Sequence, residues 1–265
     1  MKPLLRIPFK SKTMQSVLYV DSRARSPGGS DSSFQIELRE SLHLTEHGMR
    51  VDKLRLTNSF LTTDAGRFLY EKNGSGGIQY YALPEQAYTG VQLAAAMQLL
   101  TSRTTVFDPT TNSITADTVA GYEPLSDEEL KAYSSGFPAG ASGAAPLSIN
   151  SVLGTIYSFH TTANPATYTI VWHWTSMAPF DYLFLRSRRL TVENSHDPTG
   201  RHDVICCIPL TKGVGAVETA SSPDGVYLKL PSDLVLRTID FELTTWNGKL
   251  VNLRNRPLSF EICLD

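Results

Sequence analysis

Short segments in which apolar and polar residues alternate dominate the chain. Over residues 34–40, Phe34, Ile36 and Leu38 fall on one side and polar residues on the other. Successive side chains of a strand point to opposite faces of a sheet, so a period of two predicts a half-buried strand. Similar apolar or alternating segments, separated by turn-forming residues, occur at 17–20, 49–60, 78–83, 106–117, 181–188, 202–210, 225–231, 236–244, 250–253 and 258–264.

Two other segments predict helices. Thr89 is placed to cap a helix over 90–102, where apolar residues recur at helical spacing. A shorter helix is expected over 126–133, because Ser126 and Glu129 have the spacing of a capping box. About ten short strands, one or two short helices and no regular alternation of strand with helix predict an all-β antiparallel sandwich.

One domain is expected over residues 15–265, because neither half of the chain has a complete set of strands by itself. A loop insertion, rich in small residues, is expected around 120–148. Residues 1–14 contain two prolines and show no core periodicity, which predicts an extended arm. This arm is basic, because it contains Lys2, Arg6, Lys10 and Lys12 and no acidic residue.

Composition narrows the function. Of 265 residues, 41% are hydrophobic and only 19% are charged, which favours a packed domain over a disordered chain. The net charge is −2, so the chain as a whole lacks the basic charge of a nucleic-acid coat, and no sequence-specific nucleic-acid partner is expected. No apolar run is long enough to predict a membrane-spanning segment. Three cysteines, two of them adjacent, do not fit a disulfide framework.

Motifs for metal binding and nucleophilic catalysis are weak. His43 and His47 are four residues apart, but Glu46 is not placed as in a zinc-protease motif. Cys206 and Cys207 lie in an apolar strand without a neighbouring cation, so we expect buried small hydrophobic residues. Because neighbours on a strand alternate, Cys206 should face the interior of the sandwich and Cys207 the opposite face. The sequence therefore predicts no catalytic, cofactor-binding or metal-ligating residue, and the protein is not expected to be an enzyme.

Two His-Asp pairs flank one turn. His196 is followed by Asp197, and His202 is followed by Asp203. A carboxylate beside an imidazole could orient it for acid-base chemistry. We expect instead a solvated hairpin tip between two strands.

A basic run and a pair of tryptophans also have two interpretations each. Arg186, Arg188 and Arg189 could contact phosphate, but a solvated or interface-facing strand edge is the expected arrangement. Trp172 and Trp174 could form a platform on which a sugar stacks, whereas packing in a core or an interface is expected from these two residues alone.

The order of several short motifs resembles a family of viral proteins. Asp21, Ser22 and Arg25 form an Asp-Ser-x-x-Arg motif between a first strand and an alternating Phe-x-Ile-x-Leu strand. Tyr88 and Thr89 occupy the matching places of a Pro-x-x-x-Tyr-Thr unit that leads into a helix. Residues 146–154 and 239–265 are similar to a Ser-x-Asn-x-x-Leu-Gly segment and to the closing strands of the same family. The family comprises penton and other single jelly-roll minor capsid proteins of double-stranded DNA viruses whose major capsid protein is a double jelly roll. It includes those of polinton-like viruses, virophages, adintoviruses and several giant-virus lineages.

This resemblance implies a single jelly roll and a structural role, most specifically as the penton that forms a homopentamer at the icosahedral vertices of the virion. The implied partners are further copies of the chain, the major capsid protein and other minor capsid proteins, all made in the host cell. Contact with an internal membrane is left open, and no cofactor is implied. We expect the four basic residues of the arm to contact other capsid components, and Tyr80, Tyr81 and Tyr182 to be available for contacts between subunits.

Two other classes of function are retained as alternatives. A carbohydrate-binding, lectin-like β-sandwich would use Trp172, Trp174 and nearby tyrosines. A cupin-type enzyme would need a cluster of His and Glu metal ligands, which the sequence does not contain. Glycan binding would favour the first alternative, bound metal the second, and a ring of five subunits the capsid role.

Overall fold

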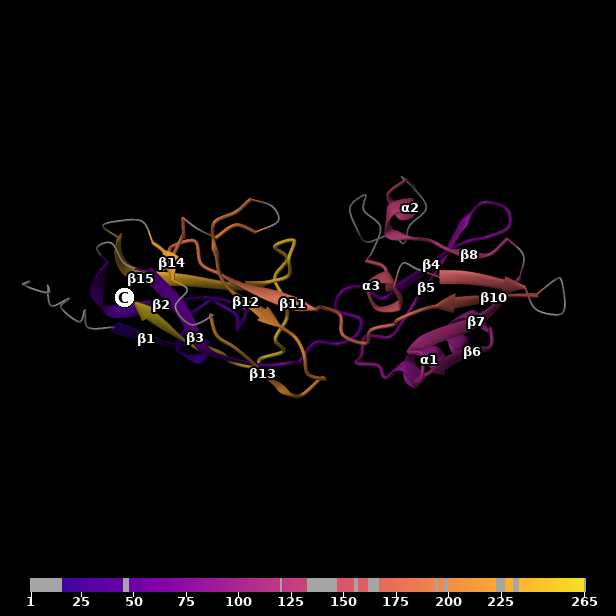
Figure 1. Cartoon of the computed structure of the whole chain (residues 1–265), viewed down its shortest axis with the longest axis horizontal. Helices are drawn as coiled ribbons and strands as arrows, with labels where there is room; N and C mark the ends of the chain where they lie inside the picture. The colour runs from indigo at the N-terminus through magenta and orange to yellow at the C-terminus, as the bar shows by residue number, and fades with distance from the viewer. Residues whose placement is uncertain are drawn as a thin grey trace, which may run out of the picture. The chain divides into compact units, whose positions relative to one another are not determined.

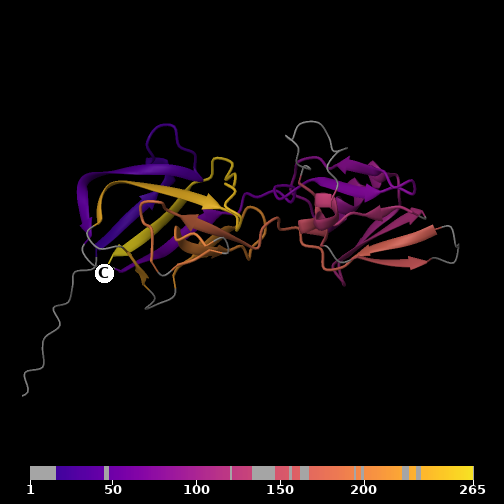
Figure 2. The same ribbon diagram turned by 90° about the horizontal axis from the view of Figure 1, so that it is seen from above.

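The chain folds into two compact units, each built mainly of antiparallel strands. The computed structural model describes residues 16–264 except 45–47, 120, 133–146, 155–156, 162–166, 194, 198–199, 223–226 and 231–233 (Figure 1). Unit 1 comprises Met1–Asn58 and Tyr182–Asp265, and unit 2 comprises Ser59–Asp181. Unit 1 is therefore discontinuous in sequence, and its first and last segments, indigo and yellow in Figure 2, lie together.

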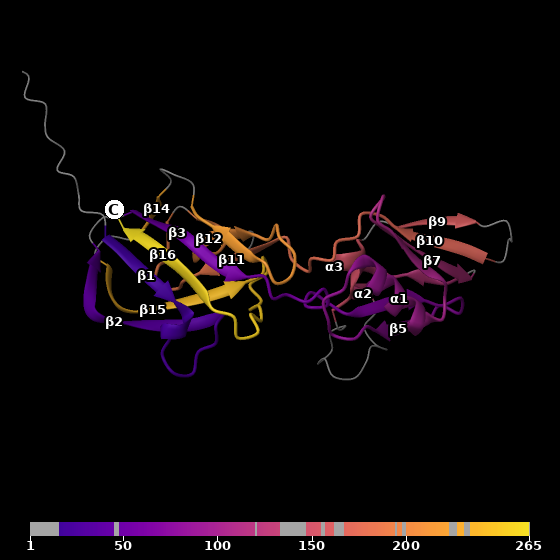
Figure 3. The ribbon, with the colours of Figure 1, turned by 90° about the horizontal axis from the view of Figure 1, so that it is seen from below.

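Unit 1 contains a five-stranded and a four-stranded antiparallel sheet. The first has the order β1 (Ser16–Asp21), β16 (Leu258–Leu264), β3 (Gly48–Thr57) and β13 (Val217–Ala220), and the short β14 (Leu228–Lys229) also pairs with β3. The second has the order β12 (Val204–Pro209), β11 (Tyr182–Arg186), β15 (Leu234–Thr244) and β2 (Ser33–Leu44). Figure 3 shows β16 running between β1 and β3.

This strand order is that of a jelly roll. Without the short β14, the eight strands counted along the chain have the orders 1-8-3-6 and 5-4-7-2, so the first strand pairs with the last and the second pairs with the seventh. The expected all-β class and the single jelly roll are therefore confirmed. The described helices, however, belong to unit 2, apart from a 3₁₀ turn at Ser22–Ala24.

The core of the jelly roll contains the inward residues of the alternating segments. Met49 and Val51 on β3 have no exposed surface, and Phe241 on β15 has none either. The Phe241 ring lies 5.5 Å from that of Phe34 and 5.0 Å from that of Phe260, measured between centroids. These three rings join strands of both sheets, as expected for residues on the two inner faces of a sandwich.

Unit 2 has its own sheets and its own core. A four-stranded sheet has the order β6 (Thr105–Asp108), β7 (Ser113–Val119), β10 (Thr167–Trp172) and β9 (Tyr157–Thr161). A three-stranded sheet has the order β5 (Ile78–Ala82), β4 (Phe68–Lys72) and β8 (Glu123–Pro124). The helices are α1 (Gly90–Thr101), α2 (Asp127–Ala132) and α3 (Asn150–Leu153). Its main core cluster includes Leu93 of α1, Ile114 of β7 and Trp172 of β10.

Both predicted helix starts are present. The Thr89 hydroxyl accepts a hydrogen bond from the Gln92 amide, and the Gln92 side chain accepts one from the Thr89 amide, which completes a capping box. Ser126 and Glu129 exchange the equivalent hydrogen bonds before α2. Local sequence therefore sets where these helices begin.

The division into units differs from the expected single domain over 15–265. Unit 2 is inserted between β3 and β11, and its described strand pairs are all internal. The stretch around 120–148 lies within this larger insertion, and its residues 133–146 are outside the described residues, as is the expected arm at 1–14. Strands of both units have the same period of two, so the pattern could not indicate which strands pair with which.

Candidate assembly and binding surfaces

The Asp-Ser-x-x-Arg motif forms a buried polar network beside the end of β1. Ser22 is fully buried, and its hydroxyl donates to Asp31 (3.0 Å) and accepts from the Leu258 amide of β16 (3.0 Å). The Arg25 guanidinium donates to the same Asp31 carboxylate at 2.7 Å. Asp21 caps the 3₁₀ turn that contains Ser22. Asp21, Ser22 and Arg25 thus fasten the β1–β2 connection to the last strand.

Tyr88 and Thr89 have a similar structural position in unit 2. The Tyr88 side chain is 5% exposed, its hydroxyl donates to the Pro84 carbonyl (2.9 Å), and its amide donates to the Thr62 hydroxyl (2.9 Å). Burial raises the pKa of the Tyr88 phenol above its ordinary value. Together with the cap at Thr89, these contacts fix the direction in which α1 leaves the preceding segment.

The Ser-x-Asn segment holds two helices together. Ser148 donates to the Asp127 carboxylate at the start of α2, and the Asn150 side-chain amide donates to the same carboxylate (2.9 Å) and to the Leu125 carbonyl (2.8 Å). The acidic start of α2 is therefore partly engaged by α3. The motif residues in both units hold elements in place.

The basic run at the end of β11 has one buried arginine and exposed ones after it. Arg186 is only 1% exposed, and its Nη1 contacts the carboxylates of Asp197 (2.8 Å) and Asp203 (2.6 Å), while its Nε donates to the Thr244 hydroxyl (2.8 Å). Its Nη2 is buried and has no hydrogen-bond partner among the described residues. The expected exposed edge is therefore wrong for Arg186, because two carboxylates distant in sequence form its binding partners.

In both His-Asp pairs the aspartate belongs to the Arg186 network, and the two histidines contact each other. Asp197 and Asp203 point to Arg186, and the rings of His196 and His202 contact each other, with centroids 4.2 Å apart. Both histidines are exposed, as expected for a hairpin tip, whereas both aspartates are buried. Both aspartates thus compensate the buried guanidinium of Arg186.

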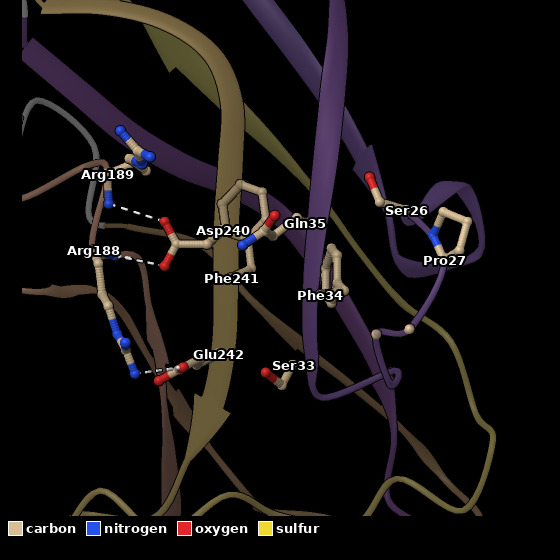
Figure 4. Close-up of a pocket in the computed structure, with 12 residues that line it drawn as sticks. Ser26, Pro27, Ser33, Phe34, Gln35, Arg188, Arg189, Asp240, Phe241 and Glu242 are labelled. Atoms are coloured by element: carbon tan, nitrogen blue, oxygen red, sulfur yellow. Dashed lines mark hydrogen bonds and ion pairs between the residues drawn. The ribbon is translucent and has the colours of Figure 1, made fainter.

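An open groove of about 490 Å³ lies beside Arg188 and Arg189 (Figure 4). The Asp240 carboxylate accepts hydrogen bonds from the backbone amides of Arg188 and Arg189, both at 3.1 Å. The Arg188 side chain forms an ion pair with Glu242 at 2.9 Å. Residues 26–29 and 33–35 form the other wall. Two cations and two carboxylates line the groove, so it has no marked preference for one sign of charge.

Apolar side chains are exposed on strands of both jelly-roll sheets. On β1, Val17 is 40% exposed and Tyr19 is 74% exposed. On the other sheet Tyr182 is 43% exposed, and its ring contacts that of Phe184, with centroids 5.5 Å apart. Cys206 is buried and Cys207 is exposed, which confirms that the two adjacent cysteines lie on opposite faces of the strand, although burial of both is wrong for Cys207.

Unit 2 exposes another set of apolar residues. Tyr80 is 42% exposed, whereas Tyr81 packs partly against the core of this unit. Trp174 is 79% exposed, but Trp172 is only 2% exposed. The paired sugar platform considered from sequence is therefore absent, since one of its rings belongs to the core.

Charge is unevenly distributed along the chain. Unit 2 contains four Lys or Arg residues and ten Asp or Glu residues, a net charge of −6. The arm at 1–14 has a net charge of +4, and the rest of unit 1 is balanced at sixteen of each sign. The small net charge of the whole chain therefore hides an acidic unit and a basic arm.

Metal and membrane sites were sought over the same part of the chain. Within the described ranges, no group of three or more His, Cys, Asp or Glu side chains is arranged to hold a metal ion. No helix found there has the length and hydrophobicity needed to cross a membrane. The polar clusters described above all engage other parts of their own unit.

Comparisons with known proteins found similarity among solved structures but not among sequences. No family model matches the chain, and no curated protein sequence matches it. Among solved structures, the chain is similar to the crystal structure of the selenomethionine-labelled mavirus penton protein, with a TM-score of 0.49 and 8% sequence identity. The match covers 95% of this chain and 99% of that one.

Proposed function

We propose that the chain is a structural capsid protein, a penton that assembles as a homopentamer at the icosahedral vertices of a virion. The observation that carries this proposal is the jelly-roll strand order of unit 1, closed by the contact of Ser22 with Leu258. Jelly rolls occur in viral capsid and lectin domains. One of the motifs that resemble minor capsid proteins, formed by Asp21, Ser22 and Arg25, connects the first and last strands of this fold.

The surfaces of the jelly roll suit self-association. A closed ring needs two different surfaces on each subunit, one fitting the other on the next copy. Exposed Val17 and Tyr19 lie on one sheet and exposed Tyr182 on the other, so both sheets offer apolar contacts. Interfaces that persist are enriched in such aromatic residues at their centres. Further contacts would be made with the major capsid protein and other minor capsid proteins.

Mass photometry of the recombinant full chain tests the assembly. Because the core of each unit is complete within one chain, we expect the monomer to fold first and then to equilibrate with a species near five times 29.2 kDa. The pentamer fraction should rise with protein concentration. Dimers or trimers as the only oligomers, both in solution and in virions, would contradict the vertex role.

The basic arm is proposed to contact other capsid components or the inner face of the capsid. Lys2, Arg6, Lys10 and Lys12 supply all four of its charges, and they precede β1 directly. A variant lacking residues 1–12 should keep the thermal stability of the parent and be incorporated poorly into particles. A second variant with all four cations changed to Gln separates charge from length. A large loss of stability in either isolated variant would contradict this role.

A further inference from the structure

Trp174 is an exposed aromatic residue in an unusual backbone conformation. Its side chain is 79% exposed, and its φ is +59°, in the left-handed region that bulky residues rarely adopt. Only two residues earlier, Trp172 is anchored in the core of unit 2. A conformation of this kind persists only where the surrounding structure enforces it.

Hydrogen bonds of the two residues that follow Trp174 hold its backbone in this conformation. The Thr175 amide and hydroxyl both donate to the Asn112 carbonyl, at 2.9 and 3.1 Å, and the Asn112 side-chain amide donates back to the Thr175 carbonyl at 2.5 Å. The Ser176 amide donates to the Val152 carbonyl at 2.8 Å. The backbone of Trp174 is thus fixed between a core residue and a hydrogen-bonded clasp. Because this backbone is fixed in advance, the segment that carries the indole loses little backbone freedom when it binds a ligand.

The neighbouring β6–β7 turn supplies polar groups. Asn112 is exposed, its Nδ2 is oriented by Thr175, and its Oδ1 accepts no hydrogen bond among the described residues. On the same turn, the Asp108 carboxylate is held by the hydroxyls of Thr110 and Thr111, at 2.7 and 3.0 Å. Amide, hydroxyl and carboxylate groups therefore lie on the segment that is clasped to the backbone next to the indole.

The composition of this surface selects a class of ligand. The centre of a protein-docking surface usually surrounds its aromatic residue with further apolar contacts. The β6–β7 turn, which is hydrogen-bonded to Thr175 next to Trp174, is polar instead. Small-molecule sites combine an apolar surface with a few placed polar groups. A pyranose has an apolar C–H face for the indole and hydroxyl groups for amides and carboxylates. The net charge of −6 on unit 2 disfavours anionic ligands such as nucleic acid, sialylated glycans or sulfated glycans.

We propose that Trp174, with Asn112 beside it, forms a binding site for neutral carbohydrate on unit 2. The indole stacks on the sugar ring, and the Asn112 side chain hydrogen-bonds its hydroxyl groups. The site lies wholly within unit 2, so it is separate from the jelly-roll surfaces through which we propose that the chain assembles. Its role is attachment to a glycosylated surface.

A glycan array of neutral, sialylated and sulfated oligosaccharides, probed with the labelled full chain, tests the site. We expect binding to neutral glycans, and titration of the array hits should show Trp174→Ala weakening it by about tenfold or more. The matched control is Trp246→Ala, which removes a tryptophan of unit 1 that is 56% exposed. Its affinity should equal that of the parent.

A measurement on the unchanged protein guards against a folding defect in the variant. Iodide quenches exposed indoles, so a saturating neutral glycan should protect Trp174 from quenching and leave Trp246 accessible. Absence of neutral-glycan binding, binding confined to anionic glycans, or full binding by Trp174→Ala would overturn the proposal. So would unchanged quenching with glycan bound, or loss of oligomers in Trp174→Ala, which would make Trp174 a contact between copies. Particle mass is measured separately, so failure of the penton role would not be confused with failure of this site.

Discussion

At the scale of single residues, the buried charges are each matched by several partners. Glu71 is 1% exposed and pairs with Arg103 at 2.7 Å, and the equally buried Glu218 accepts the backbone amides of residues 211 and 212. Arg186 is matched by two carboxylates. Removing a charge from water is costly unless nearby groups compensate it. Such residues therefore specify how loops pack against one another, and replacing them should lower the free energy of unfolding considerably.

Replacing Arg186 by Met should lower the free energy of unfolding by about 3–5 kcal/mol, because the buried Asp197 and Asp203 would both lose this cation, and Asp203 would keep only its pair with the partly exposed Arg201. Arg188→Met is the matched control: Arg188 is 69% exposed and pairs with Glu242 at the surface, so about 0–1 kcal/mol is expected. Urea unfolding of both variants measures the difference. Equal, small effects would show that the buried network contributes little to stability.

The two adjacent cysteines should differ in reactivity. Burial raises the pKa of the Cys206 thiol to about 12, and it raises that of the more exposed Cys207 to a smaller extent. A thiol reagent at pH 8 should therefore label Cys207 first, with a rate that keeps rising above the ordinary thiol pKa because the thiolate fraction is still growing. Cys207→Ser should remove this fast phase. Fast labelling that persists in Cys207→Ser would contradict the assignment.

At the scale of elements, caps and turns are set locally, but the packing face of a helix is not. The helix α1 contains no charged residue, and it buries Leu93 and Met97 while Val91 and Leu99 remain 65% and 83% exposed. Both sides of the helix are apolar, so the sequence indicated its length better than its buried face. The neighbouring strand β6 determines which face of α1 is buried, since the Phe107 ring of β6 packs where a side chain at Gly90 would lie.

Thr89→Ala should destabilise unit 2 by about 1 kcal/mol, because the Gln92 amide loses its acceptor at the start of α1. Thr89→Ser keeps the hydroxyl and should stay close to the parent. Thermal unfolding followed by circular dichroism compares the two variants. A serine variant as unstable as the alanine variant would assign the effect to lost packing of the threonine methyl group.

At the scale of the whole molecule, charge and strand pairing follow the same division. Every described strand pair joins two strands of one unit, and the acidic residues in excess belong to unit 2. The jelly roll has a complete set of eight strands without the insertion. The surfaces proposed for assembly therefore belong to unit 1, and the proposed carbohydrate site belongs to unit 2.

Residues 59–181 expressed alone should fold, because their core, built around Leu93, Ile114 and Trp172, receives no strand from unit 1. About 120 residues are enough for an independent core. A cooperative thermal transition and a dispersed amide NMR spectrum are expected. A chain without cooperative unfolding would show that unit 2 needs unit 1 to fold.

The sequence by itself determined most of the local structure. Alternation located the strands around Phe34, Ile239 and Phe260, and the residues at Thr89 and Ser126 located both helix starts. The resemblance in motif order led to the jelly roll, which the topology confirms. These features depend on a few neighbouring residues, so they can be deduced from spacing alone.

Only the tertiary structure decided which strands belong together and which polar residues are buried. The same period of two occurs in both units, so the insertion after β3 became visible only from the strand pairs. Arg186 was expected at the surface, and Trp172 and Trp174 were considered as a pair, yet Arg186 and Trp172 are buried and Trp174 is exposed. Their environments are made by residues brought together from distant parts of the chain, such as Asp203 for Arg186 and Asn112 beside Trp174. A local pattern carries no information about such partners, because long-range packing selects them.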